Sequence, residues 1–445
     1  MGKRTKYELI LTLLFAVVFG VSGQIPVIEI PKPALHNRVP IPGINTNQPN
    51  IPVNPYTIVP NSKNQLDMYE RDKRELQQSN VELYNILYKI STSDNSIQYD
   101  LPSQFGSHGT EHYQKSFEDL CGMLSGKTPL NLKDAVFAIE NAYFEGQLNY
   151  SDYNKAINNI AEIVQLKTAQ DGYDWNSPTT RNIMLFRTMS DTLTVKVPQE
   201  ETSVTHYPMQ YDFDDYNGES NWSNMFVSKL LATRKGQCHS LPLLYLILCE
   251  QTGTEAYLTY SPSHSYVKIK DGSGNWHNLE LTNGHIVTDA FIVGSGYVTS
   301  EAIKNKTYME PQTKQQVVAQ CLSDLAMGYL HKYGYDNFVK QCIDSILKYD
   351  ANNLSGLMLK ANYETIRFDY VVNQVMSPHP DILKVHYPQI YELLEERNAT
   401  YDRIDASGYR DMPKEAYESW LNSVSKEKEK REQEGKYNKT LQLIR

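Results

Sequence analysis

The chain has 445 residues, a length that predicts two or three domains, each able to bury a core. Hydrophobic residues make up 40% and charged residues 21%, as in ordinary globular proteins. A formal net charge of -9 excludes the basic footprint typical of nucleic-acid-binding proteins, so we expect no nucleic-acid partner.

The first residues have the three parts of a secretory signal peptide. A cationic start precedes an apolar run of 13 residues, Leu9–Val21, and small residues precede Gln24. This pattern predicts removal of residues 1–23. The run is too short for a transmembrane helix and no second long apolar run follows. We therefore expect an exported protein, periplasmic or secreted, with no integral membrane span after cleavage.

Two segments separate the signal peptide from the next change in pattern. Proline recurs every few residues over 24–63, which predicts an extended, semi-rigid linker. Residues 64–204 are predicted to be a mostly helical subdomain. Within it, Asn131 is a predicted N-cap, Gly146 a predicted helix stop, and Ser151 the predicted cap of the next helix.

Residues 205–313 combine helices with strands. A short amphipathic helix is predicted over Asn224–Gly236, and an apolar helix follows it. Turn residues at Asp271–Asn275 predict a hairpin between the last two of three strand-like runs. These runs are Glu255–Tyr260, His264–Lys270 and Trp276–Leu281. A helix followed by antiparallel strands predicts an α+β fold class.

Residues 314–445 return to helical patterns. Small and aromatic residues in Leu325–Asn353 lie roughly where the helix pair of a tetratricopeptide repeat packs, and a plain helical hairpin is the alternative. A weaker unit follows at 357–366. The charged stretch Ser425–Lys436 predicts a solvated helix end. If the protein has a protein partner, we expect it on this helical region.

The five cysteines are too widely spread for a disulfide scaffold, and their odd number leaves at least one thiol unpaired in a monomer. They are Cys121, Cys238, Cys249, Cys321 and Cys342. Cys238 stands at the predicted start of the apolar helix, where the helix dipole and N–H groups stabilise a thiolate and can hold an oxyanion. Gly236 is predicted to let a substrate backbone approach. Cys249, about three turns later, is predicted to pack in the core.

A thiolate nucleophile needs a base, and the base needs an orienting group. With Asp271–Asn275 as the hairpin loop, Val267 faces Leu279. His264 and Glu280 then lie diagonally on one face of the sheet, within reach of each other. The apolar pattern and the polar pair agree on this one register.

The order of these residues resembles the transglutaminase-like superfamily. That family has a Cys at a helix start, a His that opens a strand with an aromatic residue two positions later, and a Trp about four residues before an acid. The matching stretches are "GQC" (Gly236–Cys238), "HSYVKI" (His264–Ile269) and "WHNLELTNG" (Trp276–Gly284). The resemblance implies Cys238 as nucleophile, His264 as base and Glu280 as orienting acid, with no metal and no organic cofactor.

The resemblance also implies a fold. Over 205–313 it implies a papain-like core in which a buried, Cys-bearing helix packs on an antiparallel sheet. Helical segments before the core and repeat-like helices after it are similar to the layout of a bacterial branch of the family.

Several residue assignments stay open. Asp is the usual third member, so Asn283 and Asp289 are alternatives to Glu280. Gln237 and Asn224 are candidates for an oxyanion donor. His239 is not predicted to be the base, because neighbouring side chains on a helix point apart.

Zinc is a chemical alternative, since thiolate and imidazole both suit that ion. Cys238 would then bind it with His264, His277 or His285, although no pair of them has ligand spacing.

Two hypotheses follow for the function. The first is an exported cysteine hydrolase or acyltransferase that acts on peptide or carboxamide bonds, with a protein or peptide as substrate and hydrolysis favoured over crosslinking. The second is a catalytically inactive binding or scaffold protein for a partner protein or a cell-surface polymer. In the second, Cys238 would be a small core residue.

Overall fold

A computed structural model describes the chain from Ile97 onward with short gaps, together with three isolated positions. The described ranges are 97–197, 202–375, 379–410, 412–413 and 415–423, and the isolated positions are Arg71, Arg74 and Lys426. The predicted signal peptide and proline-rich linker lie outside the described residues, as does nearly all of the charged stretch Ser425–Lys436.

The chain divides into two compact units. The first includes Pro102–Tyr363 and Thr400–Arg445, and the second includes Lys32–Leu101 and Glu364–Ala399. Both candidate catalytic elements, the apolar helix and the sheet, belong to the first unit. The domain boundaries near residues 204 and 313 stay predictions.

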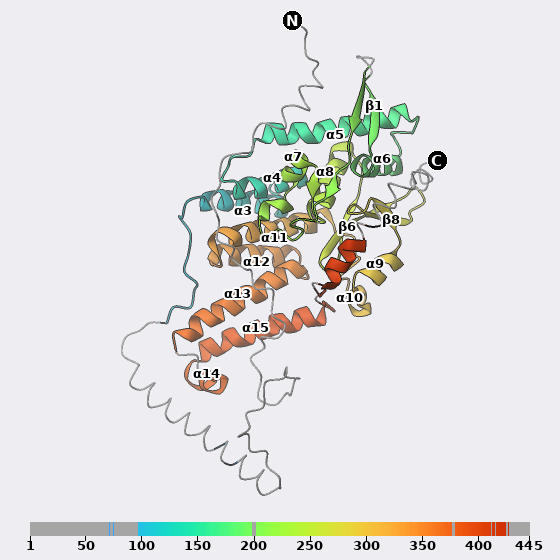
Figure 1. Cartoon of the computed structure of the whole chain (residues 1–445). Helices are drawn as coiled ribbons and strands as arrows, with labels where there is room; N and C mark the ends of the chain where they lie inside the picture. Colours follow the sequence, from blue (N-terminus) through green and yellow to red (C-terminus); the bar gives the residue numbers. More distant parts are fainter. Residues whose placement is uncertain are drawn as a thin grey trace. The chain divides into compact units, whose positions relative to one another are not determined.

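Four helices open the first unit (Figure 1). They are α3 (Thr110–Leu124), α4 (Leu132–Tyr143), α5 (Tyr150–Gln170) and α6 (Pro178–Ser190). Asn131 caps α4 as predicted, since its side chain accepts from the Asp134 N–H. The predicted cap at Ser151 is wrong: Asn149 accepts from the N–H groups of Ser151 and Asp152, so α5 begins earlier.

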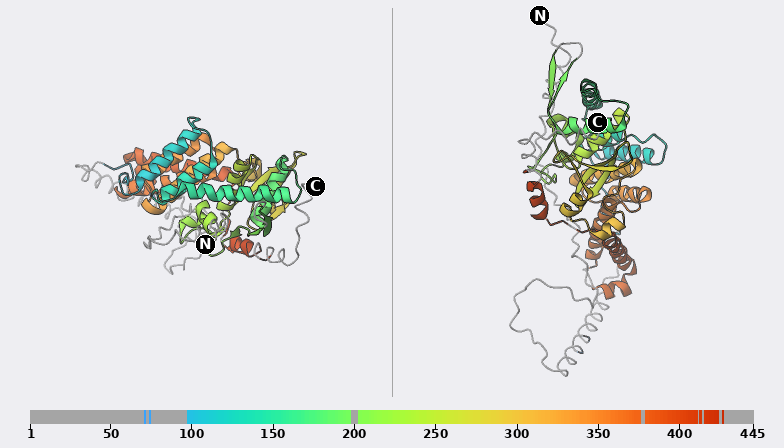
Figure 2. Two further views of the ribbon diagram at one scale, coloured as in Figure 1. Left: turned by 90° about the horizontal axis from the view of Figure 1, so that it is seen from above. Right: turned by 90° about the vertical axis from the view of Figure 1, so that its right-hand side faces the viewer.

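Short elements connect these helices to the candidate site. β1 (Leu193–Lys196) pairs with β2 (Ser203–His206) in an antiparallel ribbon that packs against α5 (Figure 2). β3 (Gln210–Tyr211) pairs in parallel with β4 (Lys235–Gly236). The single helix predicted over Asn224–Gly236 is wrong, because the segment divides into a 3-10 turn (Trp222–Met225), α7 (Val227–Thr233) and β4.

The principal sheet has four antiparallel strands in sequence order. They are β5 (Tyr257–Ser261), β6 (His264–Lys270), β7 (Trp276–Glu280) and β8 (His285–Val287). Val267 pairs with Leu279 and Lys270 with Trp276, which confirms the predicted register. The sequence prediction omitted β8. Helix α8 (Ser240–Thr252) contacts β5 and β6, so the protein is a mixed helix-and-sheet structure of the α+β class.

Helices follow the sheet, as predicted for the region after residue 314. The short α9 (Asp289–Ser295) and α10 (Ser300–Lys304) lead to α11 (Lys314–Tyr333), α12 (Asn337–Tyr349) and α13 (Leu354–Asn373). α11 packs against α12 and also against α3 and α4, so it joins helices that come before and after the sheet in the sequence. A tetratricopeptide classification of this pair stays a prediction.

The second unit has its own apolar core. It contains the C-terminal part of α13, α14 (Pro380–His386) and most of α15 (Pro388–Ala406). Buried residues from these helices, and from the turn after α13, form one cluster: Phe368, Val371, Val372, Val375, Leu383, Ile390, Leu393 and Leu394. Within the described part of the chain, no helix has both the length and the apolar character needed to cross a membrane.

Candidate active site

Helix α8 carries the candidate nucleophile at its N-terminal end. Its side chains are buried from Ser240 to Cys249, as expected for a helix that is apolar all round. The Leu241 N–H donates to the Gln237 carbonyl at 3.0 Å, so helical hydrogen bonding includes Cys238 in the first turn. Gly253 in the left-handed conformation ends the helix.

The backbone that leads to Cys238 is held by a glycine and a serine. The Gln237 N–H donates to Ser240 Oγ at 2.9 Å. A Cβ on Gly236 would lie 2.6 Å from that oxygen and 3.0 Å from Leu230 Cδ1. The space beside Gly236 is therefore filled by the protein, and its predicted use for substrate approach is wrong.

A buried carboxylate fixes the preceding helix. Glu140 on α4 accepts from the backbone N–H groups of Val227 and Ser228 at 2.6 and 2.8 Å. These N–H groups are at the start of α7, where intrahelical acceptors are lacking. The carboxylate thus anchors α7, which leads through β4 to the nucleophile.

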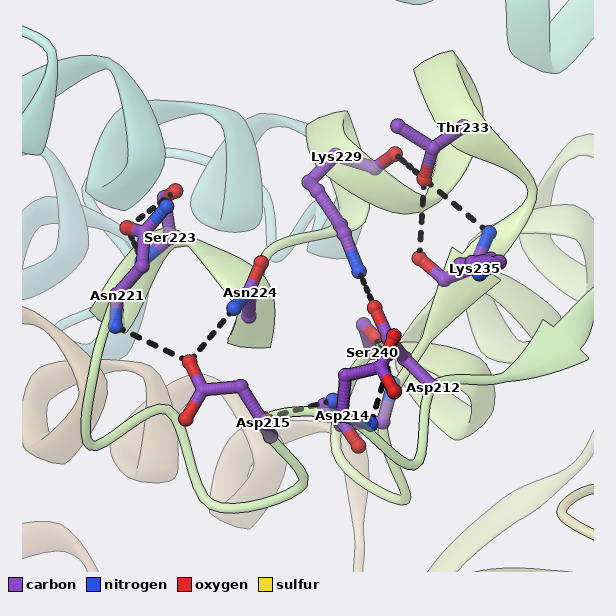
Figure 3. A network of polar contacts seen from close by, with 11 residues as sticks. Asp212, Asp214, Asp215, Asn221, Ser223, Asn224, Lys229, Thr233, Lys235 and Ser240 are labelled. Carbon is purple, nitrogen blue, oxygen red and sulfur yellow. Dashed lines mark hydrogen bonds and ion pairs between the residues drawn. The ribbon is translucent and has the colours of Figure 1, made fainter.

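A polar network holds the loop before α7 (Figure 3). Asp212 pairs with Lys229 at 2.6 Å, and Asp215 Oδ2 accepts from Asn224 Nδ2 at 2.7 Å. Gln237 Nε2 donates to the Asp215 carbonyl at 3.0 Å. Both amides that were candidates for an oxyanion donor are therefore engaged in holding this loop.

His264 is brought to Cys238 by the start of β6. The neighbouring Ser265 Oγ donates to the Cys238 carbonyl at 2.5 Å and ties the strand to the first turn of α8. Cys238 and His264 are each only 8% exposed.

Glu280, at the end of β7, is the acid that meets the histidine. Its Oε2 is 2.7 Å from His264 Nε2, and the carboxylate is 1% exposed. Its other oxygen accepts from the N–H and the hydroxyl of Thr282. The structure thus brings together Cys238, His264 and Glu280, the three residues singled out in the sequence.

The other ring nitrogen of His264 is left for the thiol. His264 Nδ1 is buried and has no partner of its own at hydrogen-bonding geometry. With Glu280 on Nε2, the tautomer and ring orientation are fixed, and Nδ1 is the nitrogen that can exchange a proton with Cys238. Such contacts are often loose before substrate binds.

The pKa values of the three groups shift in the directions that favour charge separation. Burial acts to raise the pKa of the Cys238 thiol, but the neighbouring His264 ring and its positive charge lower it overall. Burial likewise opposes charge on His264, but Glu280 and the thiol raise its pKa to about 10. Against burial, the His264 charge also lowers the pKa of Glu280.

The two alternatives to Glu280 make other contacts. Asn283 Oδ1 accepts from the His285 N–H, and Asp289 Oδ1 accepts from Asn278 Nδ2. His239 points to Asp324, 3.2 Å away, as expected for a residue that is not the base. Within the described residues, no group of three or more His, Cys, Asp or Glu side chains could hold a metal ion.

Three aromatic residues that the sequence reasoning missed also reach the site. Tyr417 Oη is 3.9 Å from Cys238 Sγ and 3.4 Å from Tyr211 Oη. The ring of Trp420 meets the ring of His264 at 4.6 Å between centroids. A sequence signal existed for two of them, because Tyr417, Trp420 and Leu421 recur at helical spacing.

Comparisons of the chain with protein-family models, with curated proteins and with solved structures found no match.

Proposed function

We propose that the protein is a transglutaminase-like cysteine hydrolase or acyltransferase that acts on peptide or carboxamide bonds of a protein or peptide. One observation carries the proposal. His264 is hydrogen-bonded to the buried Glu280 at 2.7 Å and lies beside the Cys238 thiol, whose pKa is lowered. A cysteine, a base and an orienting acid are the set that nucleophilic acyl transfer needs.

The first half of the reaction forms a thioester. The Cys238 thiolate attacks the carbonyl carbon, and the C=O electron pair moves to oxygen. When the pair returns, the C–N bond breaks and protonated His264 gives its proton to the leaving amine. Glu280 keeps the ring in place and stabilises its positive charge.

The second half releases the acyl group. His264, now neutral, takes a proton from water or from a second amine as that group attacks the thioester. The C–S bond breaks, and the sulfur leaves as the thiolate beside the imidazolium. Water gives hydrolysis and an amine gives acyl transfer, without a metal or an organic cofactor.

Export of the protein is part of this proposal and depends on the sequence alone. The cationic and apolar pattern of residues 1–23 supports a periplasmic or secreted location. In such a location protein, peptide or cell-surface amides are within reach of Cys238.

A binding or scaffold protein is the second candidate. Burial favours it, because Cys238, His264 and Glu280 are all nearly inaccessible. In this case the packed helices α11 and α12 would present the partner surface, and the polar triad would only stabilise the core.

The test is amide turnover together with thiol reactivity. Release of ammonium or amine from peptide carboxamides should occur with the full chain and with Cys249→Ala, a matched change on the same helix, but not with Cys238→Ala. Alkylation by iodoacetamide, with the site read by mass spectrometry, should fall on Cys238 first below pH 8. Turnover that survives in Cys238→Ala would remove Cys238 from the mechanism, whereas no turnover together with slow and equal alkylation of all five cysteines would favour the scaffold.

A further inference from the structure

Residues 415–423 form a short helix whose apolar side covers the candidate site; it is drawn in red in Figure 1. Tyr417 and Leu421 are buried, Trp420 is half-buried, and Glu418 and Ser419 between them are exposed. This is the spacing of one helix face. We call residues 415–423 the plug.

The plug touches the two groups that would perform the chemistry. Tyr417 reaches Cys238 Sγ at 3.9 Å, and Trp420 lies edge-on to His264 at 4.6 Å. Tyr417 also contacts Tyr211, a buried neighbour of the thiol. The side of the nucleophile from which a carbonyl could approach is thus occupied by aromatic rings.

The space that remains is too small for a substrate. The cavity beside His264 and Glu280 has a volume of about 10 Å³ and is walled by Trp420, Tyr417 and Met412. That is about the room one water molecule needs. An acyl group cannot reach Cys238 until the plug moves.

The segment before the plug is anchored much more firmly than the plug itself. Thr299 and Thr307 donate their hydroxyls to the carbonyls of Gly408 and Ser407 at 2.9 and 2.7 Å. A Cβ on Gly408 would lie 2.4 Å from the Ala302 nitrogen, so the chain is tightly packed there. The polar contacts of Tyr417 with the core are long by comparison.

We infer that the plug is an intramolecular inhibitor, which pivots on the anchored turn at residues 406–408 and leaves the site to admit substrate. This inference rests on the proposed function, since it states how that same site is regulated. Because Trp420 and Tyr417 occupy the substrate's place, the opened site accepts aromatic side chains next to the bond that is cleaved.

The first arm of the test opens the plug in the full chain. Trp420→Ala with Leu421→Ser removes apolar contacts but leaves the triad intact. Glu418→Ala with Ser419→Ala is the matched control on the exposed face of the same helix. If the plug is closed most of the time, the opened variant should alkylate at Cys238 at least about tenfold faster than the wild type, and the control should not change.

The second arm returns the plug as a separate molecule. A synthetic peptide with the sequence of residues 410–424 should protect Cys238 of the opened variant, and the same peptide with Ala at position 420 should not. Thermal unfolding of each variant shows whether the rest of the fold is intact. Protection by the peptide would hold even if the opened variant has lost some stability.

Some outcomes would overturn the plug, and others would overturn the proposed function. If Cys238 of the opened variant is alkylated no faster than in the wild type, or if the peptide has no effect, the plug is not an inhibitor, and the proposed role of the triad is unaffected. If the opened variant is alkylated faster but independently of His264, and shows no amide turnover, then the plug covers Cys238 but the proposed enzymatic function is wrong.

Discussion

The two ends of helix α8 carry the same side chain in opposite states. Cys238, in the first turn, borders His264 and has a lowered pKa. Cys249, near the end, is buried at 2% exposure beside Asn182, and burial raises the pKa of its thiol well above the usual value. Both thiols are buried, so burial alone does not explain why their pKa values shift in opposite directions. The difference comes from a cationic partner and from the helix end.

The largest effect is expected from removal of that partner. An unpaired thiol of ordinary pKa is only a few per cent thiolate at pH 7, so His264→Ala should slow alkylation of Cys238 by about 30-fold. The test is best made in the opened variant, where access does not limit the rate. His239→Ala, which removes a histidine next to Cys238 in sequence, should change the rate by less than about threefold, within the 1 kcal/mol range of one weak interaction. A His264→Ala variant as fast as its parent would contradict the pairing.

The next effect is in the pH profile. The Cys238 pKa is lowered and the His264 pKa is raised to about 10. Both groups are therefore charged at any pH that lies above the first pKa and below the second. The alkylation rate of Cys238 should therefore persist to lower pH than that of an ordinary thiol, and fall only as the thiolate is protonated. Glu280→Gln removes the charge that supports the imidazolium, and should move the fall to higher pH with a smaller rate loss than His264→Ala. A profile that Glu280→Gln leaves unchanged would separate Glu280 from the pair.

The smallest expected effect is a change in stability at the C-terminal end of α8. Cys249→Ala removes a buried sulfur that contacts Asn182 and should lower the free energy of unfolding by about 1 kcal/mol, as for loss of a small buried group. The rate of Cys238 alkylation should not change. Chemical denaturation measures the first quantity, and a change in the second would mean that the two ends are coupled.

Local patterns in the sequence predicted the parts of the site that local chemistry determines. The turn residues Asp271–Asn275 set the hairpin register, and the register put His264 and Glu280 on one face. The apolar run after Cys238 predicted the buried helix. The helix cap at Ser151 was wrong because Asn149, two residues earlier, makes the same kind of hydrogen bond. The chemical roles of the triad stay predictions.

The plug was beyond this kind of reasoning. The spacing of Tyr417, Trp420 and Leu421 predicts one apolar face, but a face does not say what it covers. The surface that this face covers depends on where the chain after α15 packs against α10. Hydrogen bonds between residues about a hundred positions apart in the sequence determine that position. Gly236 was misjudged for a related reason, because the neighbours that fill its missing Cβ position come from two helices.

The buried carboxyl of Glu140, which caps α7, makes the stability of the protein depend on pH. Burial raises the pKa of this carboxyl to about 7, although the Ser228 and Val227 contacts lower it. An unfolded chain would have an ordinary value near 4.3, so between about pH 4.3 and 7 the folded protein binds the extra proton. The contribution of Glu140 to stability is therefore greatest in acid and is lost as the pH rises to 7. The loss is one of global stability and not of the cap itself, because the N–H groups of Val227 and Ser228 bind the ionised carboxylate more strongly than the neutral acid.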